Sequence, residues 1–555
     1  MSGETQTYRV LGLALGLEEP ETLLRERALA AAGVGAEQLR GFRIARKALD
    51  ARRRGGSRRL RFVVHADLVL DAGPPPAALA RALRAGRVVP APPRGAIEVA
   101  TVDASARGAH VAVVGAGPAG LFAALVLARG GARVTLLDRG PGLRERGRAV
   151  AAFGNRRVPD PEANLLFGEG GAGTYSDGKL YTRVEHPLEV PLLEELVACG
   201  APPEVLYDAR AHVGTDRLHR ILPRLRERME ARGVSFAFQT RVEALIADAG
   251  PPRRIRALAT SCGELGCDAV VLASGHSARD TWHALERDGV ALEAKPFQLG
   301  LRIEHPQQLV DAGRYGKEMA NGLLPPAYYA LACRASEGAA AAHSFCMCPG
   351  GQIVASVNQP GLLCTNGMSN SLHSSGWANA ALVVTLGPRE LGAETWAGVA
   401  FQEALEQTAF AAGGSDYTAP AQRAPDFLAG RETRSPGATS YRFGVRPGRL
   451  DLLLPAPVRD ALRHALARFD REIPGFASEA GLLVGVETRS SGPVRLPRDE
   501  KSRRARGFAN LFPVGEGSGH AGGIMSAAID GARSAQALLE HGLAGGADRG
   551  RAPRT

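Results

Sequence analysis

Residues 111–139 read VAVVGAGPAGLFAALVLARGGARVTLLDR, and this stretch decides the fold. Its first residues, Val111–Val114, form an apolar run that is typical of a buried strand. A glycine-rich turn follows, and Leu121–Ala128 then supply strong helix formers. A second strand is expected at Arg133–Leu137. Strand, turn, helix and strand in succession predict a dinucleotide-binding unit with parallel strands.

The turn has the spacing G-x-G-x-x-G at Gly115, Gly117 and Gly120. In such units the first glycine permits the tight turn, the second leaves room for a pyrophosphate, and the third lets the helix lie close to the strand. The phosphates contact free N–H groups at the start of the helix. Asp138 follows the second strand, where a carboxylate can accept hydrogen bonds from a ribose. Because strand, helix and acid accompany the glycines, we favour a nucleotide site over a purely structural turn.

The chain has 555 residues, more than one core usually supports, so two or three domains are expected. Its apolar content of 45% is ordinary, and the N-terminus lacks the pattern of a secretory signal. Charged residues interrupt the most apolar window before it could cross a bilayer. Seven scattered cysteines give neither a disulfide framework nor paired metal ligands. We therefore expect a soluble, cytoplasmic protein with no metal site.

The formal net charge is +11, and most of the excess lies from Arg40 to Arg61, where ten basic residues accompany one acid, Asp50. Such a run can bind nucleic acid, an acidic protein or an anionic lipid, or it can form a solvated loop. Only Phe42 and Phe62 lie nearby to stack on bases. We favour the solvated loop and keep nucleic-acid binding as an alternative.

The first 70 or so residues are expected to form a small α/β module. Its predicted elements are three strands and a helix, at Tyr8–Leu13, Gly41–Lys47, Leu60–Leu70 and Pro20–Ala32. The arginine run lies between the last two strands as a loop that contains Gly55 and Gly56. A proline-rich, stiff connection then leads to the dinucleotide-binding unit.

A second glycine-rich stretch, Asn164–Leu180, contains five glycines: Gly168, Gly170, Gly171, Gly173 and Gly178. Glycine buries no side chain and is costly to order, so this density does not serve core packing. Phe167 and Tyr175 are interleaved with the glycines, unlike in a flexible surface loop. The stretch therefore predicts a backbone that approaches a flat or charged ligand closely.

The middle of the chain carries another strand with a glycine turn. A helix is predicted at Thr215–Arg232, followed by strands around Val234–Phe238 and Val242–Ile246. Asp268–Ser274 is then an apolar run that ends at Gly275 and His276. A second G-x-G-x-x-G does not follow, so the sequence offers no dedicated NAD(P)H-binding domain.

From Lys295 to about Gly475 the pattern changes to strand-like pieces separated by loops and helices, which indicates an inserted domain with a mixed sheet. Cys346 and Cys348 form a C-x-C pair within it. This spacing is neither the C-x-x-C of a redox pair nor half of a zinc site, so we favour structural thiols and expect no disulfide reductase.

Near the end, Leu511–Met525 reads as a strand, a glycine turn with Glu516, and the start of a helix from Ile524. This is a second strand-to-helix turn with an acid, about 400 residues after the first. A fold whose cofactor domain is interrupted by an insertion brings two such halves into one site.

Taken together, three motifs resemble the glutathione-reductase-like superfamily of FAD flavoproteins: VAVVGAGPAG with Asp138, the turn at Ala273–Gly275, and PVGEG-x-GHAGGI at Pro513–Ile524. More narrowly, GEGGAGTYSDGKL, GTDRL, CMCPGG, NGMS and GEGSGHAGGIMSAAIDG are similar to a bacterial family of uncharacterised FAD-dependent dehydrogenases. The basic stretch ARKALDARRR is also similar to that family, so the resemblance covers most of the chain. The superfamily usually has Glu where this chain has Asp138 and commonly Asp where it has Glu516, so only the reach of each carboxylate differs.

The resemblance implies non-covalent FAD. In it, Gly115, Gly117, Ala119 and Gly120 would hold the pyrophosphate, Asp138 the adenosine ribose and the Val242 backbone the adenine. On electrostatic grounds we also expect Glu516 on the ribityl chain and the amides of Gly523 and Ile524 at the pyrimidine edge of the flavin, because the start of the last helix presents unpaired N–H groups. The other residues expected at the cofactor are Pro118, Arg139, Gly170, Gly171, Ala172, Gly173, Lys179, Ser274, Gly275 and Gly515. The resemblance supplies no catalytic residue, and on position alone we consider His276 and His520 as acid or base.

The predicted fold class is α/β, with a split Rossmann-like FAD domain, an inserted α+β substrate domain and an N-terminal α/β module. The expected boundaries are: module 1–72, linker 73–106, FAD domain 107–294 and 481–545, inserted domain 295–480, and tail 546–555. The leading function is an FAD-dependent oxidoreductase on a small-molecule substrate, with NADH or NADPH as the donor to test. A flavin monooxygenase or saturase-type reductase on an apolar substrate, and an RNA- or partner-binding flavoprotein, are the alternatives. The sequence indicates neither the substrate nor the oligomeric state.

Overall fold

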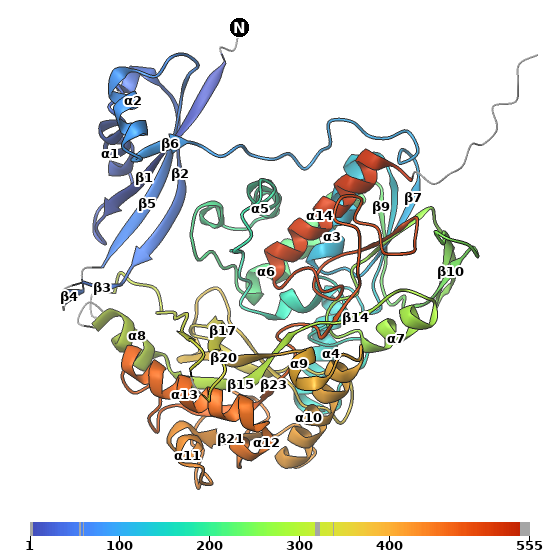
Figure 1. Cartoon of the computed structure of the whole chain (residues 1–555). Helices are drawn as coiled ribbons and strands as arrows, with labels where there is room; N and C mark the ends of the chain where they lie inside the picture. The colour runs from blue at the N-terminus through green and yellow to red at the C-terminus, as the bar shows by residue number, and fades with distance from the viewer. Residues whose placement is uncertain (1–3, 55–56, 59, 317–321, 337, 544–555) are drawn as a thin grey trace, which may run out of the picture.

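The computed structural model describes residues 4–54, 57–58, 60–316, 322–336 and 338–543. Three sheets organise the chain, and Figure 1 shows them in separate parts of the molecule. We call these parts the N-terminal module (residues 4–90), the dinucleotide domain (107–294 and 491–543) and the inserted domain (295–490). The chain leaves the dinucleotide domain once and returns to it, as the two separated glycine turns predict.

The N-terminal module is a four-stranded antiparallel sheet in the order β2-β5-β1-β6. Its strands and helices are β1 (Thr5–Leu15), α1 (Leu23–Ala32), β2 (Leu39–Asp50), β5 (Arg61–Asp71), α2 (Ala77–Arg84) and β6 (Val88–Pro90). The two short strands β3 (Arg53–Arg54) and β4 (Ser57–Arg58) form a hairpin, and the predicted loop glycines Gly55 and Gly56 lie outside the described residues.

The predicted boundary at residue 72 is wrong, because α2 and β6 belong to the module. Val88 in β6 pairs with Val10 in β1 and is completely buried. Two valines between an arginine and a proline carry too little pattern to predict a strand from sequence, and the strand forms only because β1 is there to pair with it. The expected linker therefore shortens to the stretch after residue 90.

The dinucleotide domain contains a five-stranded sheet in the order β25-β13-β7-β8-β9, with parallel pairing throughout. Its strands are β7 (His110–Val114), β8 (Arg133–Leu137), β9 (Val234–Ala237), β13 (Ala269–Leu272) and β25 (Leu511–Pro513). Continuous apolar runs suit these strands because both faces of the sheet are covered. β25 comes from the C-terminal part of the chain, so the domain is assembled from two segments.

Two helices lie side by side on this sheet, α3 (Pro118–Arg129) and α14 (Ile524–His541) (Figure 1). The two helices approach closely at Gly531 of α14. A methyl group at this position would lie only 2.0 Å from the carbonyl oxygen of Ala119 in α3, so the contact requires glycine. The remaining elements are α4 (Leu143–Arg156), α5 (Glu189–Ala198), α6 (Thr215–Glu230), α7 (Arg279–Arg287) and an antiparallel sheet of β10 (Val242–Ala247), β11 (Ile255–Thr260) and β12 (Gly263–Gly266).

The inserted domain has a seven-stranded mixed sheet in the order β16-β17-β20-β15-β23-β21-β22. These strands are β15 (Phe297–Pro306), β16 (Ala332–Cys333), β17 (Ala342–Cys348), β20 (Trp377–Leu386), β21 (Ala419–Arg423), β22 (Val445–Pro447) and β23 (Leu482–Glu487). A smaller pair within the inserted domain is β18 (Gln352–Ala355) with β19 (Thr365–Met368), and β14 (Glu293–Ala294) pairs with β24 (Val494–Arg495) where the chain leaves the dinucleotide domain and returns to it. The helices are α8 (Gln307–Tyr315), α9 (Pro388–Leu391), α10 (Ala397–Gly413), α11 (Ala424–Ala429), α12 (Leu450–Leu453) and α13 (Ala456–Glu472).

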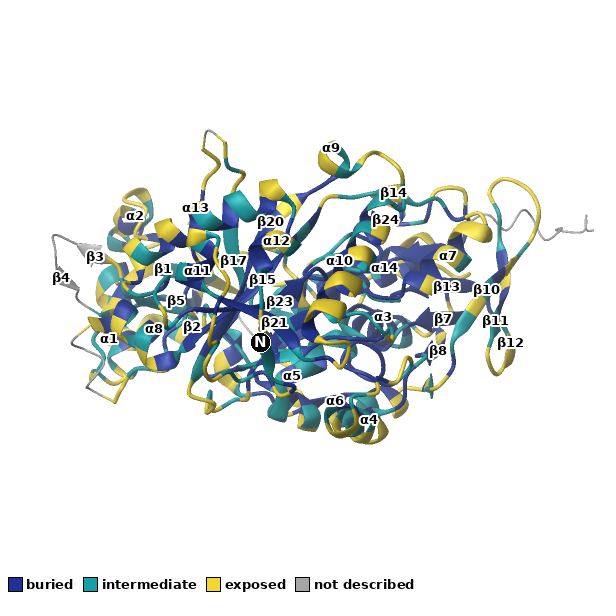
Figure 2. Ribbon diagram, turned by 90° about the horizontal axis from the view of Figure 1, so that it is seen from below, coloured by how far each residue is buried: buried dark blue, intermediate teal, exposed yellow. Residues whose placement is uncertain are grey.

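The predicted end of the insertion at residue 480 is too early, because β23 pairs with β15 and β21 inside the inserted sheet. An apolar strand has no sequence feature that says which sheet it joins. Strands of both large sheets are largely buried (Figure 2). Within the described ranges, every helix is either too short or too polar to cross a membrane.

Candidate active site

A cavity of about 1560 Å³ follows the edge of the parallel sheet where β7, β8 and β13 end. Gly117 of the dinucleotide domain, Cys346 of the inserted domain and Lys47 of the N-terminal module all line it. Small-molecule sites usually have volumes of roughly 300 to 1,000 Å³. This cavity therefore has room for a dinucleotide and a second molecule together.

The glycine turns predicted from separate stretches of sequence meet at this cavity. A methyl group added at Gly171 would lie 2.9 Å from Gly117 Cα, so the second glycine stretch packs directly on the first turn. A methyl group at Gly517 would lie 2.2 Å from the carbonyl oxygen of Gly275. Tertiary packing thus joins four glycine-rich segments into one smooth surface.

Two helices begin at this surface without side-chain caps. Gly117 precedes α3 and Gly523 precedes α14, and neither position supplies a capping side chain. The first N–H groups of each helix therefore remain for an anionic or polar ligand. A methyl group at Gly522 would meet no atom within 4 Å, so the approach to α14 is open. These features fit a pyrophosphate at α3 and the polar edge of a flavin at α14.

All of the predicted cofactor residues except Gly120 and Gly170 line the cavity. Gly120 instead provides close packing, because a methyl group there would lie 1.8 Å from the carbonyl oxygen of Gly115. Gly170 has a φ of 82° and turns the chain beside Thr174. Both glycines therefore shape the backbone of the site from behind its surface.

Asp138 is buried and accepts three backbone hydrogen bonds. Its carboxylate oxygens lie 2.8 Å from the Ala116 nitrogen, 2.8 Å from the Gly140 nitrogen and 2.9 Å from the Gly168 nitrogen. Burial raises the pKa of Asp138, although these amides oppose the effect. Most of its hydrogen-bonding capacity is thus used within the protein, which ties both glycine stretches together before any ribose binds.

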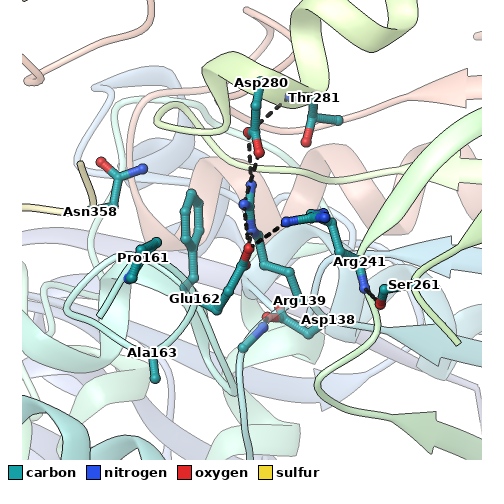
Figure 3. Close-up of polar contacts among 12 residues, drawn as sticks. Asp138, Arg139, Pro161, Glu162, Ala163, Arg241, Ser261, Asp280, Thr281 and Asn358 are labelled. Carbon is teal, nitrogen blue, oxygen red and sulfur yellow. Dashed lines mark hydrogen bonds and ion pairs between the residues drawn. The ribbon is translucent and has the colours of Figure 1, made fainter. Parts of the chain in front are cut away.

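Arg139 also lines the cavity, but its charge is already paired (Figure 3). Its guanidinium lies 2.5 Å from a carboxylate oxygen of Glu162 and 2.8 Å from one of Asp280 in α7. The same group stacks on the Phe167 ring, 4.4 Å from its centroid. Arg139 therefore fixes the loop and helix around the cavity, and it does not present a free cation to a ligand.

Lys179 stands at the centre of a polar cluster on the opposite side of the cavity. Its Nζ lies 2.7 Å from Asp177, 3.8 Å from Cys346 Sγ and 4.0 Å from Cys348 Sγ. Burial alone would lower the pKa of Lys179, but Asp177 and the two thiols raise it well above its usual value. Lys179 therefore stays an ammonium group at neutral pH.

His212 and His373 lie beside Asp177, and one ligand atom from each of the three falls within 4.8 Å of the others. The His373 ring is hydrogen-bonded to the Pro349 carbonyl at 2.7 Å. Burial, with His373 close by, lowers the pKa of His212 to about 4, so its ring is neutral. Because Asp177 already pairs with Lys179, we treat this group as part of the polar cluster and assign no metal to it.

The two histidines suggested by sequence line the cavity but are poor acids or bases at neutral pH. Burial and the charge of Arg489 lower the pKa of His276 to about 4. Burial and Arg498 lower the pKa of His520 to about 4, and its Nε2 hydrogen-bonds to the Leu496 carbonyl at 2.9 Å. The position of each histidine in the sequence correctly predicted that it faces the cavity. The arginines that lower the pKa values of the two histidines could not be predicted in this way, because no local pattern shows that they lie beside the rings.

Glu516 differs from these two histidines, because its pKa is shifted towards neutral pH. Burial raises the pKa of its carboxyl to about 7, although the Lys295 ammonium acts against the shift. Glu516 lines the cavity beside Gly515, as the C-terminal turn predicts. Glu516 is therefore an acid that titrates near neutral pH, and at pH 7 it is only partly ionised.

Several residues at or behind the cavity were not singled out from sequence. Behind its surface, Arg146 is fully buried, and its guanidinium donates to the carbonyl oxygens of Asn164 and Glu169 at 2.9 and 2.7 Å, which holds the glycine loop in place. Tyr329 and Arg489 line the cavity from the inserted domain. Asp177 was also missed, although it had a usable signal: it and the predicted Lys179 are opposite charges that flank Gly178 in a glycine loop.

Comparison with known proteins agrees with this geometry. Residues 108–152 match the family model described as "FAD binding domain", and residues 296–490 match "FAD-dependent protein, C-terminal domain-like". A Clostridium beijerinckii protein described as "Uncharacterized protein" is 40% identical over 435 residues, which are 78% of this chain and 81% of the relative. The chain belongs to the same family as this clostridial protein.

Solved structures resemble the chain only distantly. L-proline dehydrogenase from P. horikoshii has 12% identity and a TM-score of 0.33, covering 79% of this chain and 94% of that one. CtdE in complex with FAD has 10% identity and a TM-score of 0.30, covering 78% and 83%.

The matched family models and the fit of the cavity identify the cofactor. The chain binds FAD. The open turns at Gly117 and Gly522 and the two uncapped helix starts are what this dinucleotide requires. The expectation of FAD in place of NAD, drawn from two distant glycine turns with acids, is confirmed.

Proposed function

We propose that this protein is an FAD-dependent oxidoreductase of the glutathione-reductase-like type, acting on a small-molecule substrate that binds in the same cavity as the flavin. The observation that carries the proposal is the continuity of this cavity, from Gly117 at the dinucleotide turn to Lys179 and Cys346 at the polar cluster. FAD supplies redox chemistry by accepting and donating hydride or single electrons. The protein supplies binding, orientation and control of protons.

Each part of the cavity has a role in this proposal. The turn from Gly115 to Ala119 and the start of α3 would hold the pyrophosphate, and the Val242 backbone would face the adenine. Asp138 has capacity for a further hydrogen bond to the ribose, beyond the three that it accepts from the protein. Glu516 and the start of α14 would face the ribityl chain and the pyrimidine edge.

The outer part of the cavity supports a substrate with negative charge. Arg183 and Arg210 line this part, and neither forms an ion pair with a carboxylate among the described residues. Arg210 lies between two aromatic rings, 5.0 Å from the Tyr181 centroid and 4.7 Å from the Tyr328 centroid. A guanidinium that is held in place but not neutralised is suited to bind a carboxylate or phosphate.

The N-terminal module adds to this outer part. Lys47 in β2 joins the dinucleotide domain through its backbone, 2.7 Å from its nitrogen to the Tyr207 oxygen and 2.9 Å from its oxygen to the Ala209 nitrogen. Arg46 and Arg52 line the cavity from the same region. Part of the basic run therefore faces the cavity, which differs from the solvated loop that we expected.

The first test is the absorbance spectrum of the purified protein, followed by anaerobic titration with NADH and with NADPH. We expect a bound flavin spectrum that bleaches with one of the two donors or with the physiological reductant. A protein without flavin absorbance that also fails to take up added FAD would exclude the proposal. Flavin that is bound but never turns over with any of a panel of anionic substrates would leave a binding role.

A further inference from the structure

We propose that Cys346 is a nucleophile that attacks an electrophilic carbonyl or conjugated carbon of the substrate in the flavin cavity. This inference rests on the proposed function, because it places the substrate beside Lys179 and the cofactor. The sequence predicts two structural thiols in the C-x-C pair. The structure separates them: Cys348 is completely buried, whereas Cys346 lines the cavity.

The backbone directs Cys346 into the cavity by an irregularity in β17. The register of β17 against β20 shifts between Phe345 and Cys348, which is a β-bulge. In a regular strand successive side chains alternate between faces, yet Phe345, Cys346 and Met347 all line this one cavity. Cys346 has a φ of 45°, a conformation that residues other than glycine rarely adopt. Bulges and strained residues of this kind are concentrated at functional sites.

Two cations surround the thiols. Lys179 Nζ lies 3.8 Å from Cys346 Sγ. Arg302 is fully buried, and it donates a hydrogen bond to the Cys346 carbonyl oxygen at 2.7 Å while lying 3.5 Å from Cys348 Sγ. The neighbouring Cys348 thiol, together with these two cations, lowers the pKa of Cys346 well below its usual value, against the effect of burial. This environment favours the thiolate, which is the nucleophilic form of cysteine.

A second feature of the cavity points independently to a ligand at this place. The hydroxyl of Tyr329 is buried and has no hydrogen-bond partner among the described residues, although the residue is only 2% exposed and lines the cavity. An unpaired buried hydroxyl costs free energy of about 1 to 3 kcal/mol. A substrate oxygen that accepts from Tyr329 would relieve this cost, and it would lie in the same chamber as Cys346.

The proposed step is a reversible addition. A bond forms between Cys346 Sγ and the electrophilic carbon, and the π electrons of the carbonyl or of the conjugated system move to the carbonyl oxygen. That oxygen takes a proton from the Lys179 ammonium, so the thiolate and the ammonium are both neutralised. Asp177 holds Lys179 at 2.7 Å and keeps it charged before the addition. Elimination returns the proton to Lys179 and releases the thiolate.

Alkylation of the flavin-loaded protein by iodoacetamide at pH 6.5, with the modified cysteines identified by mass spectrometry, tests the reactivity of the thiol. An ordinary thiol with a pKa near 8.5 is only about 1% thiolate at this pH. We expect Cys346 to react at least about 10-fold faster than the exposed Cys262, and C262S to leave that fast reaction unchanged. Lys179→Met should slow the alkylation of Cys346 by about 10-fold, and its flavin content is measured in the same sample so that a loss of FAD is told apart from a loss of thiol reactivity.

Two further measurements test whether Cys346 is a thiolate and whether it forms a covalent adduct. The absorbance at 240 nm should show a thiolate at pH 7 in the wild type that Cys346→Ser lacks. Cyclohex-2-enone should add to Cys346 in the wild type, giving a covalent mass increase that is absent in Cys346→Ser. If Cys346 reacts no faster than Cys262, with a rate that rises up to pH 8.5, the inference is wrong. A protein with a reactive Cys346 but no FAD would instead refute the proposed function alone.

Discussion

The cavity has two walls of different construction. The glycine wall consists of the turns at Gly115–Gly120, Gly170–Gly173, Gly275 and Gly515–Gly523, and it presents backbone and helix ends. The polar wall consists of side chains, among them Lys179, Cys346 and Arg489. The glycine wall suits a cofactor that stays bound, since backbone N–H groups do not titrate and their partial positive charge is the same at every pH. The polar wall can hold and move protons, as turnover of a substrate requires.

The two walls also differ in what keeps them in place. The glycine wall depends on close backbone contact at Gly115, Gly120 and Gly171, where an added methyl group would lie 2.2, 1.8 and 2.9 Å from a main-chain atom. The polar wall depends on buried ion pairs, such as Arg489 with Glu406 at 2.6 Å and Arg302 with Glu487 at 2.8 Å. Glu406 also lies 3.0 Å from Arg279 in α7, which joins the inserted domain to the dinucleotide domain. Substitutions in each wall should therefore fail in different ways.

The largest effect is expected in the glycine wall at Gly120. A methyl group there would lie 1.8 Å from the carbonyl oxygen of Gly115, which belongs to the main chain and cannot move aside like a flexible side chain. Gly120→Ala should destabilise the chain by about 3 kcal/mol or more and abolish FAD binding. Flavin content per chain and urea unfolding measure both effects. Gly266→Ala in β12 is the matched control, since its methyl group would meet only one atom, 4.0 Å away. Equal flavin content in the two variants would contradict close packing at Gly120.

In the polar wall, Glu406→Gln leaves two buried guanidinium groups, Arg279 and Arg489, without their shared carboxylate. We expect a loss of roughly 3 to 5 kcal/mol in the free energy of unfolding. Glu403→Gln, in the same helix and 39% exposed, should cost less than about 1 kcal/mol. Burial opposes ionisation of Glu406, but Arg489 and Arg279 lower its pKa to about 2.

The pH dependence of this difference follows from the lowered pKa. The ionised carboxylate stabilises the fold above pH 4.5, and this contribution is lost as the pH falls through about 2. The gap between wild type and Glu406→Gln should therefore shrink between pH 4 and pH 2. A gap that is constant over this range would show that the charge of Glu406 is not what stabilises the domain contact.

Glu516 belongs to a turn of the glycine wall, and its carboxyl can exchange a proton like the groups of the polar wall. Unlike that of Glu406, its ionised form should destabilise the fold. Its pKa is raised from 4.5 to about 7, so the fold loses stability as the pH rises through this range. Glu516→Gln should be more stable than the wild type at pH 8.5, by at most about 3 kcal/mol, and equal to it near pH 4. Thermal unfolding of flavin-loaded and flavin-free protein measures this, with the exposed Glu500→Gln as control. Identical unfolding curves for wild type and Glu516→Gln at both pH values would contradict a raised pKa of the Glu516 carboxyl.

The smallest effect is expected for the cations of the outer cavity. Arg210→Ala should weaken binding of an anionic probe such as benzoate by about 10-fold, which corresponds to about 1.4 kcal/mol. The perturbation of flavin absorbance on titration with benzoate gives the affinity. Arg81→Ala, an exposed position on α2, should leave it unchanged. If both variants bind benzoate as the wild type does, the cavity does not select anions through Arg210.

Much of the glycine wall could be predicted from the sequence. The strand at Val111–Val114 and the helix start at Ile524 match β7 and α14 closely. The polar wall could not be predicted in the same way. Cys346 looks structural from its C-x-C spacing, and its exposure to the cavity depends on a bulge that no local pattern reveals. The same holds for His276 and His520, whose pKa values depend on arginines far along the chain.

The sequence by itself determined the dinucleotide turn, the split of its domain and the cofactor, because each of the two glycine turns on which these depend is a backbone conformation encoded within about 30 residues. Only the tertiary structure decided which strands belong to each sheet, including β6 and β23. It also decided which charges meet, since Lys179, Cys346 and Asp177 come together from segments up to 169 residues apart. Electrostatic effects and burial act through space, and neither is written in the order of residues along the chain.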